Sequence, residues 1–149
     1  VQTCALPIFL ARGEMIIDGI KLNLRNVKVP IYELATREDH IAPAPSVFRG
    51  AKLYGGPVTF VLGGAGHIAG VINPPSKNKY QYWTNSAPVA SLEEFIAGAT
   101  ETKGSWWPDW AAWIAGQSAA KVPATGARQP GKGTLKAIED APGRYVRTR

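Results

Sequence analysis

Two short polar segments each follow an apolar, β-branched run, and each carries one side chain that can move a proton. The first segment contains Asp39 and the second contains His67. Loops beyond the carboxyl ends of neighbouring parallel strands lie close together, so we expect the carboxylate to reach one nitrogen of the imidazole. An acid followed along the chain by a histidine is the order of the last two members of some nucleophile–acid–histidine triads. The pair therefore predicts the base of an acyl-transfer or hydrolysis site.

The elements that must position this pair are strands and helices in alternation. The sequence predicts a hairpin over 15–24 with its turn at Asp18-Gly19, strands over 29–35 and 58–62, and helices over 46–54 (capped by Ser46), 91–99 and 107–118. Apolar strands that bracket a helix, without strict alternation, favour a buried parallel sheet. The expected fold class is therefore α/β.

Each candidate residue also has a simpler interpretation. Asp39 could cap a local turn, and His67, which follows a glycine-rich corner, could be a packed surface residue. His40 could contact substrate, although an exposed loop histidine is the simpler interpretation. A metal site on His40 and His67 lacks a third ligand at suitable spacing, and the glycines of residues 63–70 match neither a phosphate loop nor a dinucleotide motif. We expect neither a metal nor a cofactor.

A credible nucleophile does not precede the pair. Cys4 is the single cysteine, and it lacks the flanking glycines that a nucleophile elbow needs. We therefore reject Cys4 as the catalytic thiol. Residues 1–8, VQTCALPI, resemble a sequencing-adapter oligonucleotide translated in frame, which predicts a non-native segment. The alternative is a genuine apolar segment, such as a strand.

Composition restricts the remaining function classes. The net charge is +6, but the basic residues are scattered, so we interpret the charge as aiding solubility and secondarily as attracting an anionic substrate, not nucleic acid. One cysteine excludes an internal disulfide framework, and no apolar run predicts a transmembrane helix. We expect a flexible linker and tail over 121–149, with the linker over 121–134, and with the stretch 137–146 docking back onto the core.

Four tryptophans gather near the start of the last predicted helix. Trp106, Trp110 and Trp113 would share one face of that helix, with Trp107 beside them. The first interpretation is packing of the helix onto the core. An apolar surface for an acyl chain or polymer comes second, and a sugar platform third.

Several longer motifs resemble one known family. They are DHIAP over 39–43, GHIAGVINPP over 66–75, YWTN over 82–85, GAT over 98–100, GSWWPDW over 104–110 and APGRYV over 141–146. Together they resemble the C-terminal portion of class I poly(3-hydroxyalkanoate) synthases, and the resemblance runs from about residue 9 to residue 149. It implies that residues 9–120 are the C-terminal part of an α/β-hydrolase catalytic domain, with a partial parallel sheet, flanking helices and a Trp-rich helical extension.

The resemblance also implies a chemistry. These synthases polymerise (R)-3-hydroxyacyl-CoA into polyester and release CoA, using a cysteine nucleophile with His67 as the matching base and Asp39 as its partner. Acyl-CoA is then a substrate and not a cofactor. Implied partners are the growing polyester chain, the surface of a cytoplasmic polyester granule and a second copy in a homodimer. Ala44 departs from the family, in which a larger residue often follows the proline of the acid loop.

Two rivals stay open at this point. An esterase or depolymerase on the same fold would carry a serine where the synthase has its cysteine. A non-catalytic granule-binding module would use the Trp-rich helix and the cationic C-terminal tail, which carries Arg144, Arg147 and Arg149.

Because the nucleophile elbow is missing from this sequence, we expect the 149-residue chain by itself to be inactive, and poorly soluble or unstable. The purified chain should release no CoA from 3-hydroxybutyryl-CoA in a thiol-release assay. Measurable turnover would contradict this expectation.

Overall fold

The computed structural model describes residues 2–148, and the side chains of residues 7–148. Its first element is a helix, α1 (Gln2–Arg12), so the alternative of an N-terminal strand is wrong. Gln, Ala, Leu and Arg favour helix, and an isolated strand would leave its backbone groups unpaired. The side chain of Cys4 lies outside the described side chains.

The predicted hairpin is confirmed. Strands β1 (Ile16–Ile17) and β2 (Ile20–Lys21) pair antiparallel around Asp18-Gly19. Both turn residues have positive φ, 50° for Asp18 and 75° for Gly19, which a two-residue hairpin turn of this hand requires.

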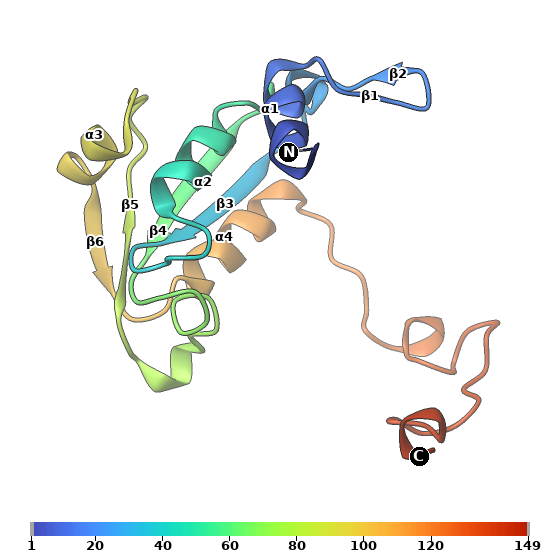
Figure 1. The fold of residues 1–149 in the computed structure, drawn as a ribbon. Coiled ribbons are helices and arrows are strands. Elements are labelled where there is room, and N and C mark those ends of the chain that lie inside the picture. Colours follow the sequence, from blue (N-terminus) through green and yellow to red (C-terminus); the bar gives the residue numbers. More distant parts are fainter. Residues whose placement is uncertain (1, 149) are drawn as a thin grey trace. The chain divides into compact units, whose positions relative to one another are not determined.

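The main sheet contains four strands in the order β3-β4-β5-β6 (Figure 1). They are β3 (Ile31–Thr36), β4 (Val58–Gly63), β5 (Gln81–Thr84) and β6 (Thr100–Lys103). β3 and β4 are parallel, as expected, with Ile31 opposite Val58 and Thr36 opposite Gly63. The β4–β5 and β5–β6 pairs are antiparallel, so the prediction of a parallel sheet is wrong beyond the first pair.

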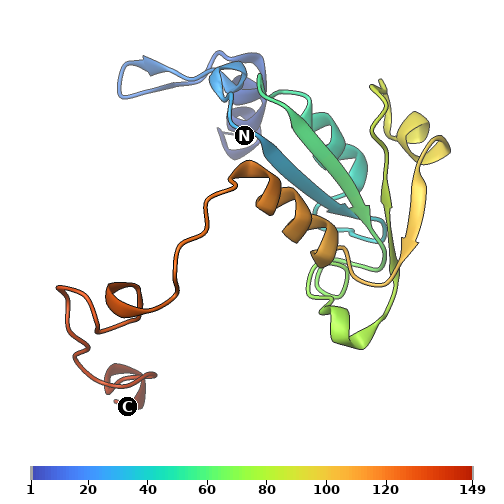
Figure 2. The ribbon, with the colours of Figure 1, turned by 180° about the vertical axis from the view of Figure 1, so that it is seen from behind.

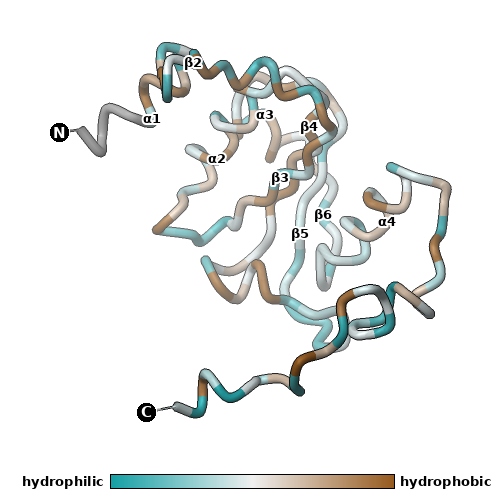
Figure 3. Tube along the Cα trace, turned by 90° about the vertical axis from the view of Figure 1, so that its right-hand side faces the viewer, coloured by the Kyte–Doolittle hydropathy of each residue, from teal (hydrophilic) through white to brown (hydrophobic). Residues whose placement is uncertain are grey.

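The strands β5 and β6 were not predicted, and for β6 the sequence explains why. All four residues of β6 are exposed, and its sequence is TETK, so it carries no apolar signal. Figure 3 shows the contrast between hydrophobic β4 and much less hydrophobic β6. The connection from β4 to β5 contains no long crossover helix, and a strand that returns without such a crossover pairs antiparallel.

Two helices cover one face of the sheet, and the start of a third covers the other face (Figures 1 and 2). On the first face, α2 (Ala44–Ala51) and α3 (Leu92–Ala97) bury an aromatic core of Phe48, Phe60 and Phe95. The Phe48–Phe60 and Phe60–Phe95 ring pairs are edge-to-face at 4.9 and 5.0 Å. On the second face, Val61, Tyr82 and Trp106 pack together at the start of α4 (Trp107–Gln117).

The predicted start of one helix is wrong. Ser46 was predicted to cap the first of these helices, but α2 begins at Ala44 after Pro43, and Ser46 lies inside it. Pro45 lies in the first turn of α2, where the fixed φ of proline suits a helix and its missing N–H needs no partner, so the helix begins earlier than the serine suggests. Ser91 does cap α3, because its hydroxyl accepts a hydrogen bond from the Glu94 N–H at 3.1 Å.

Residues 115–149 form a second compact unit. It contains two short 3-10 helices, η3 (Gly126–Arg128) and η4 (Tyr145–Arg147). The predictions of a linker over 121–134 and of docking by 137–146 stay predictions. In the described part of the chain, no helix has the length and apolar character needed to cross a membrane.

A substitution of Phe95 tests this core, because the Phe95 side chain is 1% exposed and contacts Phe48 and Phe60. We expect Phe95→Ala to lower the free energy of unfolding by about 3–5 kcal/mol through lost burial and a new cavity. The matched control is Ile96→Ala on the same helix, where the side chain is 44% exposed and the cost should stay below about 1 kcal/mol. Urea unfolding followed by circular dichroism measures both, and equal losses would contradict the assigned core.

Candidate active site

The two predicted site residues lie at the same edge of the sheet. Asp39 follows the end of β3, and His67 follows the end of β4. These strands are parallel and in register up to Thr36 opposite Gly63, so both loops leave the sheet side by side. Backbone hydrogen bonds then join the loops, from the Arg37 N–H to the Gly63 carbonyl at 2.8 Å and from the Glu38 N–H to the Ala65 carbonyl at 3.0 Å.

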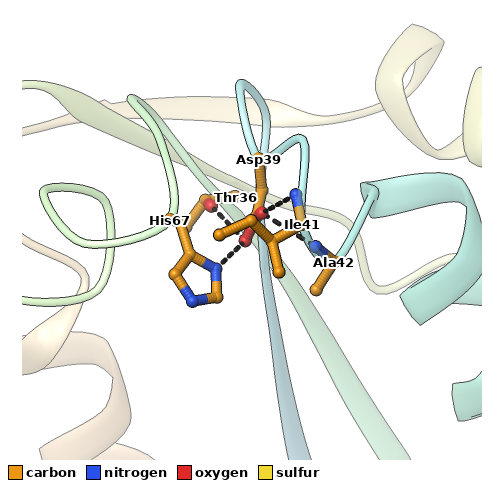
Figure 4. A network of polar contacts seen from close by, with 5 residues as sticks. All are labelled: Thr36, Asp39, Ile41, Ala42 and His67. Atoms are coloured by element: carbon orange, nitrogen blue, oxygen red, sulfur yellow. Dashed lines mark hydrogen bonds and ion pairs between the residues drawn. The ribbon is translucent and has the colours of Figure 1, made fainter.

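The predicted contact between the pair is present. Nδ1 of His67 lies 2.7 Å from Oδ2 of Asp39. The His67 side chain is 45% exposed, whereas that of Asp39 is 7% exposed. Figure 4 shows the second ring nitrogen of His67 turned away from Asp39. The carboxylate is therefore held within the corner, and Nε2 is presented outward.

Asp39 uses its two carboxylate oxygens for different tasks (Figure 4). Oδ1 accepts hydrogen bonds from the N–H groups of Ile41 at 2.8 Å and Ala42 at 2.9 Å, which closes a local turn. Oδ2 faces His67 and also accepts a 3.5 Å hydrogen bond from the Thr36 hydroxyl. The interpretation of Asp39 as a turn cap and its interpretation as the partner of a histidine are thus both correct.

These hydrogen bonds stabilise the ionised carboxylate. They lower the pKa of Asp39 from 3.8 to about 2, with the Ala42 N–H as the largest cause and the contacts to His67 and Ile41 adding to it, against a smaller opposing effect of burial. Asp39 therefore stays negatively charged at neutral pH. A fixed negative charge beside Nδ1 orients the imidazole and holds the Nδ1–H towards the carboxylate.

Comparison with known proteins identifies the family of this chain. No protein-family model matches it. The chain is 53% identical over 149 residues to the poly(3-hydroxyalkanoate) polymerase subunit PhaC of Rhizobium meliloti, covering 100% of the chain and 24% of that protein. It is 49% identical over 148 residues to the poly(3-hydroxyalkanoate) polymerase of Methylorubrum extorquens, and 47% identical over 137 residues to the subunit PhaC of Cupriavidus necator. These two matches cover 99% and 92% of the chain, and 24% and 23% of the respective relatives.

The chain belongs to the poly(3-hydroxyalkanoate) polymerase family. It spans about a quarter of the length of these relatives. The resemblance first identified from the histidine and tryptophan motifs is thereby confirmed.

The remaining candidates of this polymerase-family chain lie outside the Asp39–His67 contact. His40 is exposed, and it takes no part in the hydrogen bonds of Asp39. Within residues 2–148, no group of three or more His, Cys, Asp or Glu side chains is arranged to hold a metal ion. A substrate contact by His40 stays a prediction.

Sequence reasoning missed the residues that shape the loop carrying His67. Gly70 is one, because a Cβ there would lie 2.5 Å from the Gly64 carbonyl oxygen and from the Thr36 side chain. Two indole groups are others, since Trp106 and Trp107 donate hydrogen bonds to the carbonyls of Gly70 and Val71, each at 3.0 Å. The interpretation of the tryptophans as core-packing residues is confirmed for Trp106, which is 9% exposed. No spacing rule links tryptophans to a loop so far away in the sequence.

The lowered pKa of Asp39 predicts a pH dependence of stability. Because folding lowers this pKa, the ionised group stabilises the fold fully above its ordinary pKa of 3.8, and this contribution is lost as the pH falls towards about 2. Asp39→Asn should therefore be less stable than the parent at about pH 6, and the difference should shrink as the pH is lowered to about 2. Urea unfolding at several pH values measures it, with Glu38→Gln as the control on a neighbouring exposed carboxylate. A difference independent of pH would contradict the assignment.

Proposed function

We propose that this chain supplies the general base of a poly(3-hydroxyalkanoate) polymerase site, with His67 as the base and Asp39 as its partner. The single observation that carries the proposal is the 2.7 Å contact between Nδ1 of His67 and Oδ2 of Asp39 at the carboxyl ends of two parallel strands. The outward Nε2 is then available to take a proton from a nucleophile. The polymerase names of the relatives supply the reaction class.

The nucleophile in this proposal is a cysteine contributed by a part of the polymerase outside these residues. In the first step, Nε2 of His67 accepts the cysteine S–H proton, and the thiolate attacks the carbonyl of a 3-hydroxyacyl-CoA thioester. A new enzyme thioester forms as the bond between the carbonyl carbon and the CoA sulfur breaks. The imidazolium returns its proton to the departing CoA thiolate, so His67 ends this step neutral.

The same base serves chain extension. Nε2 accepts the proton of a 3-hydroxyl group, and the resulting oxygen nucleophile attacks an enzyme-bound acyl thioester. An ester bond forms, the bond to the cysteine sulfur breaks, and the leaving thiolate takes the proton back from the imidazolium. The fixed charge of Asp39 stabilises the imidazolium in both steps and holds the Nδ1–H towards the carboxylate.

The fold proposed for the whole polymerase is the α/β-hydrolase type. Among the described residues, β3 has no strand partner on its outer edge, and we propose that the sheet continues there into the part of the protein that carries the nucleophile. We further propose that His40 contacts substrate, and that the enzyme acts without a cofactor. It would work as a homodimer at the surface of cytoplasmic polyester granules.

The decisive experiment measures CoA release in a complete polymerase, made by placing these 149 residues in the matching region of the Rhizobium meliloti relative. His67→Gln should lower kcat by about 10³-fold or more, and Asp39→Asn by about 10²- to 10⁴-fold, because general-base catalysis and the orientation of the base are lost. Folding of each variant is checked by circular dichroism. Glu38→Gln, on an exposed neighbour, is the control and should stay within about twofold. Activity of His67→Gln close to that of the parent would exclude His67 as the base.

A further inference from the structure

One short segment, residues 104–107, contacts the loop that follows His67 at three points. The Asn73 side-chain amide donates to the Gly104 carbonyl at 3.5 Å, the Trp106 indole N–H donates to the Gly70 carbonyl at 3.0 Å, and the Trp107 indole N–H donates to the Val71 carbonyl at 3.0 Å. We call residues 104–107 the tryptophan clamp. It lies far from His67 in the sequence but directly against residues 70–73.

The clamp is also fixed to the strand that leads to Asp39. The ring of Trp106 stacks on that of Tyr32 in β3, with centroids 6.0 Å apart. The Tyr32 hydroxyl donates a 2.8 Å hydrogen bond to Asp109 in the first turn of α4. Burial and then the hydrogen bond to Asp109 raise the pKa of Tyr32, so this hydroxyl keeps its proton and stays a donor. One segment thus contacts the strand before Asp39 and the loop after His67.

The loop needs an external partner because of how its backbone bonds are arranged. The Gly70 N–H bonds to the Gly66 carbonyl and the Ile72 N–H to the Ile68 carbonyl, each at 2.8 Å, so residues 66–72 form a turn around His67. The last carbonyls of a helical turn lack partners within the turn. The two indole N–H groups bond to the carbonyls of Gly70 and Val71 at this end.

The clamp itself is well held. The side chains of Ser105 and Trp106 are buried, and the Ser105 hydroxyl accepts a 3.1 Å hydrogen bond from the Trp107 N–H. By contrast, the His67 side chain is 45% exposed and is held by its contact to Asp39. The position of the imidazole therefore depends on the backbone of its loop.

We propose that Trp106 and Trp107 are positioning residues of the polymerase site, because their indole N–H groups hold the loop at the geometry in which His67 meets Asp39. This inference rests on the proposed function of the pair. Among the described residues, neither indole N–H bonds to His67 or Asp39, so both act through the carbonyls of Gly70 and Val71. The tryptophan clamp thereby sets the direction of Nε2.

The test replaces each indole by a phenyl ring, which keeps an aromatic side chain but removes the donor. Trp107→Phe is the primary variant, since Trp107 is only partly buried, and Trp106→Phe is the second. Trp110→Phe is the matched control. Its indole N–H makes no hydrogen bond among the described residues, yet the ring centroids of Trp110 and Trp106 lie 5.8 Å apart. In the complete polymerase that carries these 149 residues, mass spectrometry follows amide hydrogen exchange over residues 66–73, and proton NMR follows the Nδ1–H of His67.

We expect exchange over residues 66–73 to become about five- to tenfold faster in Trp107→Phe and Trp106→Phe, as for the loss of one hydrogen bond, and to be unchanged in Trp110→Phe. The Nδ1–H resonance should weaken or shift in the first two variants alone. In the complete polymerase, kcat should fall about five- to tenfold while KM stays within about twofold. If these two variants lose only global stability, with local exchange and the Nδ1–H resonance as in the parent, the positioning role of the tryptophan clamp is contradicted.

The two proposals fail in different ways. If Trp107→Phe loosens the loop and lowers kcat, but His67→Gln retains activity, the catalytic role of His67 is wrong and the clamp acts on another group of the loop. In the opposite case, His67→Gln is inactive, but Trp107→Phe and Trp106→Phe match Trp110→Phe in amide exchange, in the Nδ1–H resonance and in kcat. The positioning role of the tryptophan clamp is then wrong, and the proposed catalytic pair is retained.

Discussion

The parallel pairing of β3 with β4 is the constraint on which the site depends. It brings the ends of both strands to one edge of the sheet, and the backbone bonds of Arg37 and Glu38 continue the alignment into the loops. A shift of one residue in this register would turn every side chain of the shifted strand to the opposite face and separate Asp39 from His67. The aromatic core under α2 and α3 and the packing at the start of α4 hold the register from the two faces.

The two oxygens of the Asp39 carboxylate bind different partners, and this explains how a loop at the surface keeps a defined geometry. Oδ1 of Asp39 is committed to the backbone of its own loop, so the side chain cannot rotate away without losing two hydrogen bonds. Only Oδ2 remains for the imidazole. Without these two backbone hydrogen bonds, the carboxylate would lose side-chain conformational entropy whenever it contacted the histidine.

Local sequence signals predicted the elements around the site but not all of the sheet or the supports of the site. The apolar runs before Asp39 and His67 predicted two adjacent strands and hence the contact between these residues, because that inference needs only strand ends. β6 was missed because its exposed residues carry no periodic apolar signal, and the cap at Ser46 was wrong because the helix already begins at Ala44, with Pro45 in its first turn. The indole bonds to residues 70 and 71 join segments distant in sequence, so no local pattern encodes them.

The exposed character of β6 has a consequence for where the sheet can be extended. Its sequence alternates threonine with a carboxylate and an ammonium group, and charged side chains on an outer strand oppose the addition of a foreign strand. The opposite outer strand, β3, is partly buried and more apolar. The charges on β6 therefore disfavour a further strand on that side, so the sheet has one protected edge and one edge, at β3, that is suited to continuation within a larger protein.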